Sequence, residues 1–139
     1  MPEQLADARI QQFLASKEVL VLCTVQRSGA PLAMPMWFLH TPEALYMLSV
    51  DGLQKVRNLR RDSRLCVVAE AGTRGAAIRG VIIQGRAEFI VDPAQQRPVV
   101  DQLLDKYNPD LARLWGGRAM PPNRVLFRIV AEKVRSWGL

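Results

Sequence analysis

The sequence contains few of the residues that usually mark a metal site or a disulfide framework. Its 139 residues include two cysteines, Cys23 and Cys66, and one histidine, His40. The cysteines are far apart in sequence, and each lies inside an apolar run, where a free thiol behaves as a small hydrophobe. A lone histidine without a nearby cluster of cysteines or carboxylates does not complete a metal site. We therefore expect no metal site, no disulfide framework and a reducing, cytosolic environment.

Long apolar segments and frequent aromatic residues are also lacking. No stretch approaches the ~20 apolar residues that span a bilayer, and the start, Met1-Pro2-Glu3-Gln4, lacks the basic and apolar segments of a signal peptide. The formal charge is +6, but aromatic residues make up only 6% of the chain and no basic run exceeds two residues. These features predict a soluble, cytoplasmic protein that binds a small anionic ligand rather than a membrane or nucleic acid.

The order of apolar patterns predicts a single, mainly β domain over residues 1–139. Hairpin-spaced strands with few flanking helices favour an antiparallel sheet, and six or seven such strands favour a barrel, which removes exposed edges. The first strand is dense enough in apolar residues to be buried on both faces or nearly so. The predicted strands cover residues 19–25, 31–40, 44–49, 65–69, 77–91 (with a possible break at Gly85) and 124–137, and the predicted helices cover 2–16, 53–61, 94–107 and 111–115.

The helix predicted over residues 53–61 begins at a position suited to an anion. Its apolar residues recur every three positions, at Leu53, Val56 and Leu59. The first N–H groups of a helix have no partner within the helix, and the helix dipole is positive there. Lys55 and Arg57 would strengthen such a phosphate site. The alternative is a surface helix whose cations are only solvated.

Pro35 lies in the middle of an apolar strand, where proline is unusual. Proline cannot donate to a sheet ladder, so the side that would carry its N–H must be an edge, a bulge or a place where something other than a strand lies alongside. One interpretation is an edge strand with ordinary core side chains. The other is that a flat ligand packs against this strand, with Met36 and Trp37 as its wall.

Four segments carry a more specific signal when they are taken together. They are Gly29-x-Pro31-x-x-x-Pro35-x-Trp37-Phe38, Leu45-Tyr46-x-x-Ser49, Gln54-Lys55-x-Arg57-Asn58-Leu59-Arg60-Arg61-Asp62 and Gly85-Arg86-Ala87. In this order they resemble the pyridoxamine 5'-phosphate oxidase-like flavin and deazaflavin oxidoreductases. The resemblance implies a split β-barrel of six to seven antiparallel strands with Greek-key connections. It also implies a homodimer with the cofactor, FMN or the deazaflavin coenzyme, at the subunit interface.

The resemblance also implies positions for the cofactor. The residues implied to line the isoalloxazine and ribityl chain are Met34, Pro35, Met36 and Trp37, and those implied to hold the phosphate are Ser49, Gln54, Lys55, Arg57 and Asn58. The chain departs from pyridoxamine phosphate oxidases proper. Leu53-Gln54-Lys55 stands in place of Ser-Arg-Lys, Met34-Pro35-Met36 replaces the Arg-Met/Ile-Val of the flavin strand, and the C-terminal Arg-x-His has no counterpart. Oxidation of vitamin B6 is therefore not expected.

Three functions remain open at this level. The first is an oxidoreductase that uses FMN, or deazaflavin, for hydride transfer to or from a small organic molecule. The cofactor would carry the chemistry, so we assign no catalytic residue, although Arg79 and Arg128 are candidates to stabilise a reduced flavin. The second is a non-catalytic flavin- or haem-binding module for storage or sensing, with His40 as the candidate haem ligand. The third is a nucleic-acid-binding barrel, in which phosphate contacts would come from Arg60, Arg61, Arg64 and Arg124.

Overall fold

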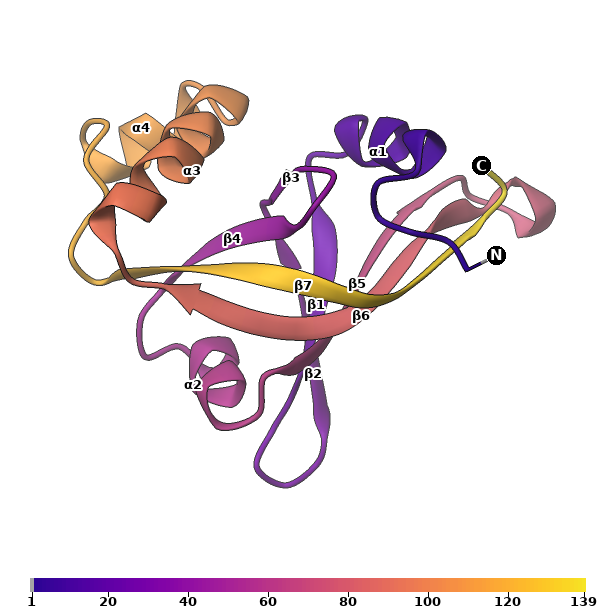
Figure 1. The fold of residues 1–139 in the computed structure, drawn as a ribbon, viewed down its shortest axis with the longest axis horizontal. Coiled ribbons are helices and arrows are strands. Elements are labelled where there is room, and N and C mark those ends of the chain that lie inside the picture. Colours follow the sequence, from indigo (N-terminus) through magenta and orange to yellow (C-terminus); the bar gives the residue numbers. More distant parts are fainter. Residues whose placement is uncertain (1) are drawn as a thin grey trace.

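A computed structural model, which describes residues 2–139, shows one seven-stranded antiparallel sheet that curls into a split barrel (Figure 1). The strands are β1 (Leu20–Val25), β2 (Pro31–Met36), β3 (Leu39–His40), β4 (Leu45–Val50), β5 (Arg64–Ala71), β6 (Arg79–Ile90) and β7 (Arg124–Trp137), in the sheet order β2-β1-β5-β6-β7-β4-β3. The helices are α1 (Ala8–Ala15), α2 (Gln54–Arg61), α3 (Pro93–Lys106) and α4 (Asp110–Trp115), with a 3-10 turn, η1 (Gly75–Ala77). The predicted mainly β, split-barrel class is confirmed.

Two predicted elements have different bounds in the structure. The strand predicted over residues 31–40 is divided into β2 and β3, because the buried N–H of Phe38 donates to the hydroxyl of Tyr107 instead of to a strand. The helix predicted over residues 2–16 begins only at Ala8. The residues before it are held in another way, since Glu3 forms an isolated bridge with Val134 on β7. Among residues 2–139, no helix is both long and apolar enough to cross a membrane.

The first strand is buried on one face and partly covered on the other. Burial alternates along β1, so that Leu22 and Thr24 are buried while Val21, Cys23 and Val25 are only partly covered. The same alternation is seen on β5. The barrel therefore keeps an apolar outer face over these strands, and its main core lies on the inner face only.

Helix α2 is attached to the barrel by a buried polar contact. The side-chain amide of Asn58, which is fully buried, donates to the hydroxyl of Thr24 on β1 at 3.0 Å. The Asn58 carbonyl oxygen accepts from the Gln54 amide at 2.7 Å. Leu59 of the same helix packs into the main core with Phe13 of α1. These contacts fix where α2 begins relative to the sheet.

Helices α3 and α4 form an insertion between β6 and β7, which pair with one another along most of their length. Figure 1 shows these helices on the opposite side of the β6–β7 ribbon from α2. They enclose a second apolar cluster, whose buried members are Leu39, Val100, Leu103, Leu104, Tyr107, Leu111 and Leu126. Leu126 alternates with Arg124 and Arg128 on one face of β7. It is nevertheless 1% exposed, because the inserted helices cover that part of the sheet.

The long strand β6 is continuous, with an irregular register at Gln84/Gly85. A Cβ at Gly85 would collide with the carbonyl oxygen of Val130 on β7. The glycine therefore permits close approach of the two strands at this bulge, where the sequence had suggested a possible break.

Candidate functional site

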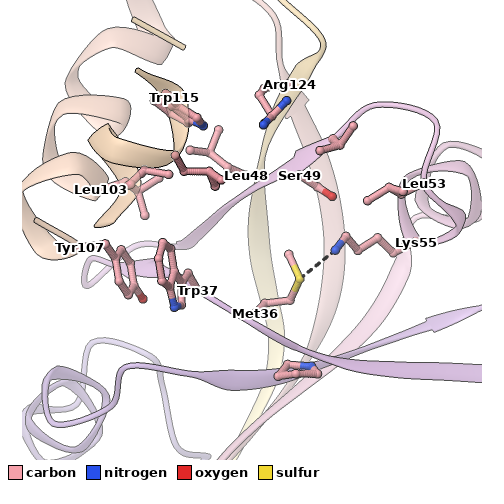
Figure 2. A pocket seen from close by; sticks show the side chains of 14 residues that line it. Met36, Trp37, Leu48, Ser49, Leu53, Lys55, Leu103, Tyr107, Trp115 and Arg124 are labelled. Atoms are coloured by element: carbon pink, nitrogen blue, oxygen red, sulfur yellow. Dashed lines mark hydrogen bonds between the residues drawn. The ribbon is translucent and has the colours of Figure 1, made fainter. Parts of the chain in front are cut away.

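A pocket of about 360 Å³ lies in the split of the barrel, between the edges of β2 and β4 (Figure 2). Strand β4 pairs with β7 from Leu45 to Val50, but with β3 only at Leu45 and Tyr46. The edge of β4 over residues 48–50 is therefore open. Met36 and Trp37, at the end of β2, form the facing wall. The pocket thus occupies the gap left where the two sheet edges separate.

One end of the pocket is polar and positively charged. Ser49 is 7% exposed, and its hydroxyl has no hydrogen-bond partner within residues 2–139. Lys55 and Arg124 also line the pocket, and neither forms an ion pair with any residue that the structure describes. The lining contains no acidic residue. A buried hydroxyl beside two cations without carboxylate partners suits an anionic ligand.

Lys55 is placed by the start of α2. The helix begins after Leu53, whose backbone is extended and which provides no side-chain cap, and Leu53 itself lines the pocket. The Lys55 ammonium lies 3.3 Å from the sulfur of Met36, a weak acceptor. Burial lowers the pKa of Lys55 below its usual value. A bound anion would supply the charge partner that the protein itself does not provide.

The other end of the pocket is apolar and comes from the inserted helices. Its α3 and α4 residues are Leu103, Tyr107, Leu111, Leu114 and Trp115, and Leu48 of β4 adds to it. Trp37 stacks on Tyr107, with ring centroids 4.3 Å apart and planes inclined by 8°. The phenol and indole rings therefore form one continuous aromatic wall.

Tyr107 holds the short segment that joins β2 to β3. Its hydroxyl accepts a hydrogen bond from the Phe38 N–H at 2.8 Å and donates to the carbonyl of Glu18 at 2.8 Å. Burial raises the pKa of Tyr107 to about 12, so the hydroxyl is a donor at neutral pH. Lys106 donates to the Phe38 carbonyl at 2.7 Å, and burial lowers its pKa to about 8. The N–H and carbonyl groups of Phe38, which lies between β2 and β3, therefore find their partners in the side chains of Lys106 and Tyr107 at the end of α3.

Five of the nine residues predicted to bind the cofactor line this pocket: Pro35, Met36, Trp37, Ser49 and Lys55. The other four lie outside its lining. Met34 packs against the main core, and Arg57 is exposed on α2. Gln54 and Asn58 are hydrogen-bonded to one another, and this contact stabilises the first turn of α2. The roles of all nine in binding remain predictions.

Other candidates from the sequence lie elsewhere. Arg79 and Arg128 do not line the pocket, and Arg128 pairs with Glu88 at 2.6 Å. His40 is also outside the lining, with its Nδ1 2.9 Å from the side-chain oxygen of Gln11. Burial, and then the charge of Lys106, lowers the pKa of His40. Residues 2–139 contain no group of three or more potential metal ligands.

The sequence did not identify the apolar half of the pocket. The helical periodicity over residues 94–107 places Leu103 and Tyr107 on one apolar side, but it does not show that this side also reaches a pocket. Trp115 and Arg124 had no local signal, because their position depends on how the insertion folds back over β4 and β7. Only Pro35, in the middle of an apolar strand, indicated from the sequence that a strand partner could be missing.

The fold and the pocket together define a small split-barrel protein whose pocket has one polar, positively charged part and one apolar part. The family model for pyridoxamine 5'-phosphate oxidase matches residues 6–138, so the chain belongs to this family. A conserved hypothetical protein from Mycobacterium tuberculosis is 30% identical, with a TM-score of 0.81 over 94% of this chain and 83% of the other. No curated protein matches the sequence.

Two more distant structures share the fold. A FAD-binding protein from Mesorhizobium loti is 22% identical, with a TM-score of 0.74 over 94% of this chain and 92% of the other. The haem storage protein HutZ from Vibrio cholerae is 17% identical, with a TM-score of 0.78 over 96% and 94% of the two chains. Of these two proteins with the same fold, one is thus a FAD-binding protein and the other a haem storage protein.

Proposed function

We propose that the protein is a flavin-dependent oxidoreductase that binds FMN, or the deazaflavin coenzyme in its place, in the pocket at the split. Its substrate is a small organic molecule. The unpartnered hydroxyl of Ser49 carries the proposal, because it is 7% exposed and lies beside Lys55. A buried hydroxyl without a partner is costly unless a ligand supplies one. The phosphate oxygens of such a cofactor fit this requirement.

The residues of the chain have distinct tasks in this proposal. Ser49, Lys55 and the first N–H groups of α2 bind the phosphate, and Arg124 adds a second positive charge. Met36 and Trp37 form the wall for the planar ring, while the inserted helices keep water from its other side. The bound cofactor supplies the hydride chemistry, so the chain need only position its ligands and exclude water.

Lys55→Ala is expected to weaken FMN binding about 10- to 100-fold without unfolding the protein. A charge-assisted contact to phosphate contributes about 1.5–3 kcal/mol, and the partly buried lysine has no ion-pair partner to lose within residues 2–139. Titration followed by flavin fluorescence measures the affinity, and thermal melting checks the fold.

Lys133→Ala is the matched control for this experiment. Lys133 is exposed on β7 and lies outside the pocket, so the same loss of charge should leave affinity nearly unchanged. Equal affinities for wild type and Lys55→Ala, with normal melting, would show that the phosphate binds elsewhere.

The alternative is a non-catalytic flavin- or haem-binding module for storage or sensing, which the resemblance to a haem storage fold supports. The geometry favours it less. His40, the single histidine, does not line the pocket and is engaged by Gln11. An absorption spectrum of the purified protein distinguishes the two: flavin bands support the oxidoreductase, and a Soret band supports haem.

We further propose that the protein is a homodimer with its cofactor sites at the interface. The outer face of the barrel carries apolar residues that are only partly covered, namely Val21, Cys23, Val25, Val68 and Ile82. A second copy would remove this surface from water, and stable dimers commonly bury ~2,000 Å² or more. Sedimentation should give twice the 15.6 kDa mass of one chain at micromolar concentration. A species of 15.6 kDa would contradict the proposal.

A further inference from the structure

The two cysteines of the chain are far apart in sequence but lie directly opposite one another in the sheet. Strands β1 and β5 are antiparallel neighbours, and their register pairs Cys23 with Cys66. The residues before and after each cysteine are buried, whereas both cysteines are only partly covered. Because successive side chains of a strand point to opposite faces, both thiols lie on the outer face of the barrel.

The spacing of this pair suits a disulfide bond. In an antiparallel pair, residues directly opposite one another have Cα atoms about 4.5 or 5.5 Å apart, depending on the type of pair. Disulfide bonds usually join residues whose Cα atoms are roughly 4.4–6.8 Å apart. Burial, and then the charge of Cys23, raises the pKa of Cys66, which agrees with two neighbouring sulfurs. The two thiols can therefore be joined without moving the strands apart.

Neither thiol has another strong contact. Within residues 2–139, the only hydrogen bond of either sulfur is a weak one of 3.8 Å, from the Cys66 thiol to the carbonyl of Val67. Neither cysteine lines the pocket in the split of the barrel. A second copy on this outer face, as proposed above, would cover the pair. The sulfurs are thus accessible in a separated chain, and a partner would shield them.

We propose that Cys23 and Cys66 form a redox modification site, at which a hydroperoxide converts the two thiols of a separated chain into a disulfide. The Cys23 thiolate attacks one peroxide oxygen, the O–O bond breaks, and the other oxygen leaves as water after taking up a proton from solvent. This step leaves a sulfenic acid on Cys23. The Cys66 sulfur then displaces the hydroxyl group, which leaves as water with the thiol proton, and the S–S bond forms. The two sulfurs together lose two electrons, and the peroxide gains them. The inference does not rest on the proposed cofactor.

The test treats dilute, reduced protein with hydrogen peroxide and then labels the remaining thiols with iodoacetamide. Dilution favours separated chains. We expect the chain to lose the mass of two hydrogen atoms, to take up no label, and to yield one linked peptide that contains both cysteines. Dithiothreitol should restore both thiols. Cys23→Ser and Cys66→Ser should each prevent the link within the chain.

A displaced pair tests whether the register is the cause. Cys66→Ser combined with Val68→Cys keeps two cysteines on the outer face of the same two strands, but the new one lies opposite Val21. Its distance from Cys23 is then the diagonal spacing of about 7–8 Å, beyond the usual range for a disulfide. The link should form roughly tenfold more slowly or less readily still in this variant. Thermal melting checks that the variant is folded.

Three outcomes would overturn the inference. In the first, peroxide leaves both thiols reactive, or oxidises them to sulfinic acid without a link, which would mean that the sulfurs do not reach one another. In the second, the link joins two chains, seen as a covalent dimer on a non-reducing gel. In the third, the displaced pair forms its link as fast as the wild-type pair, so that the facing positions of the two cysteines are not what brings the sulfurs together.

Discussion

Met36→Arg is expected to lower the free energy of unfolding by about 3–5 kcal/mol and to abolish cofactor binding. Met36 is 7% exposed and belongs to the main core cluster, although its sulfur also faces the pocket. The sulfur of Met36 lies 3.3 Å from the Lys55 ammonium. An arginine at this position would therefore bury a second positive charge close to that of Lys55. A domain with a total stability of about 5–15 kcal/mol would lose much of it. Urea denaturation measures this change.

Met36→Leu separates the effect of charge from the effect of shape. It conserves most of the side-chain volume, so it should cost less than about 1.5 kcal/mol and leave a folded protein. An arginine variant with a wild-type urea midpoint would show that the side chain swings out of the core. This result would also mean that the wall at the end of β2 is more open than the structure indicates.

Asn58→Leu is expected to lower stability by about 3 kcal/mol. Asn58 is 0% exposed, and its amide is the donor to the Thr24 hydroxyl, which is itself 1% exposed. The leucine would leave that hydroxyl without its donor in the interior, and it would release the Gln54 contact at the start of α2. Chemical denaturation gives the stability, and FMN titration should show weaker binding as the helix start loses its position.

A second substitution identifies the cause of this loss. Thr24→Val removes the hydroxyl, so in the double variant no buried polar group remains unpaired between β1 and α2. Replacing both partners by apolar groups of similar shape costs much less than replacing one. The double variant should therefore be more stable than Asn58→Leu alone. If the two losses simply add, the hydrogen bond between these side chains is not what attaches α2.

The fold was largely predictable because its signals are local. The turn at Gly29, the alternating strands and the apolar stripe of α2 each depend on neighbours in sequence. The exceptions have long-range causes. How far the outer residues of β1 are covered depends on what lies against them, and in a single chain they remain partly uncovered. Nothing near Leu126 in sequence shows that α3 and α4 cover it.

The candidate site likewise has one part that the sequence predicted and another part that depends on long-range contacts. Met36, Trp37, Ser49 and Lys55 lie within one segment of 20 residues, 36–55, so hairpin spacing and the resemblance together bring them close. Apart from Leu48, the apolar half comes from residues more than 45 positions further on. Stacking of Tyr107 on Trp37 connects positions 70 apart, and no periodicity encodes such a contact.

The insertion of α3 and α4 between two strands that already pair also bears on how this protein can change. Strands β6 and β7 are paired from Gly80 and Trp137 to Ile90 and Leu126, with one irregularity at Gln84/Gly85, so pairing along the strands defines their alignment without the intervening helices. The phosphate end of the pocket is contributed largely by residues 35–55, before that hairpin. Residues 93–123 can therefore be exchanged as a module while the polar end of the pocket is kept, provided that the replacement still shields Leu39 and Leu126 from water and still supplies partners for the Phe38 backbone.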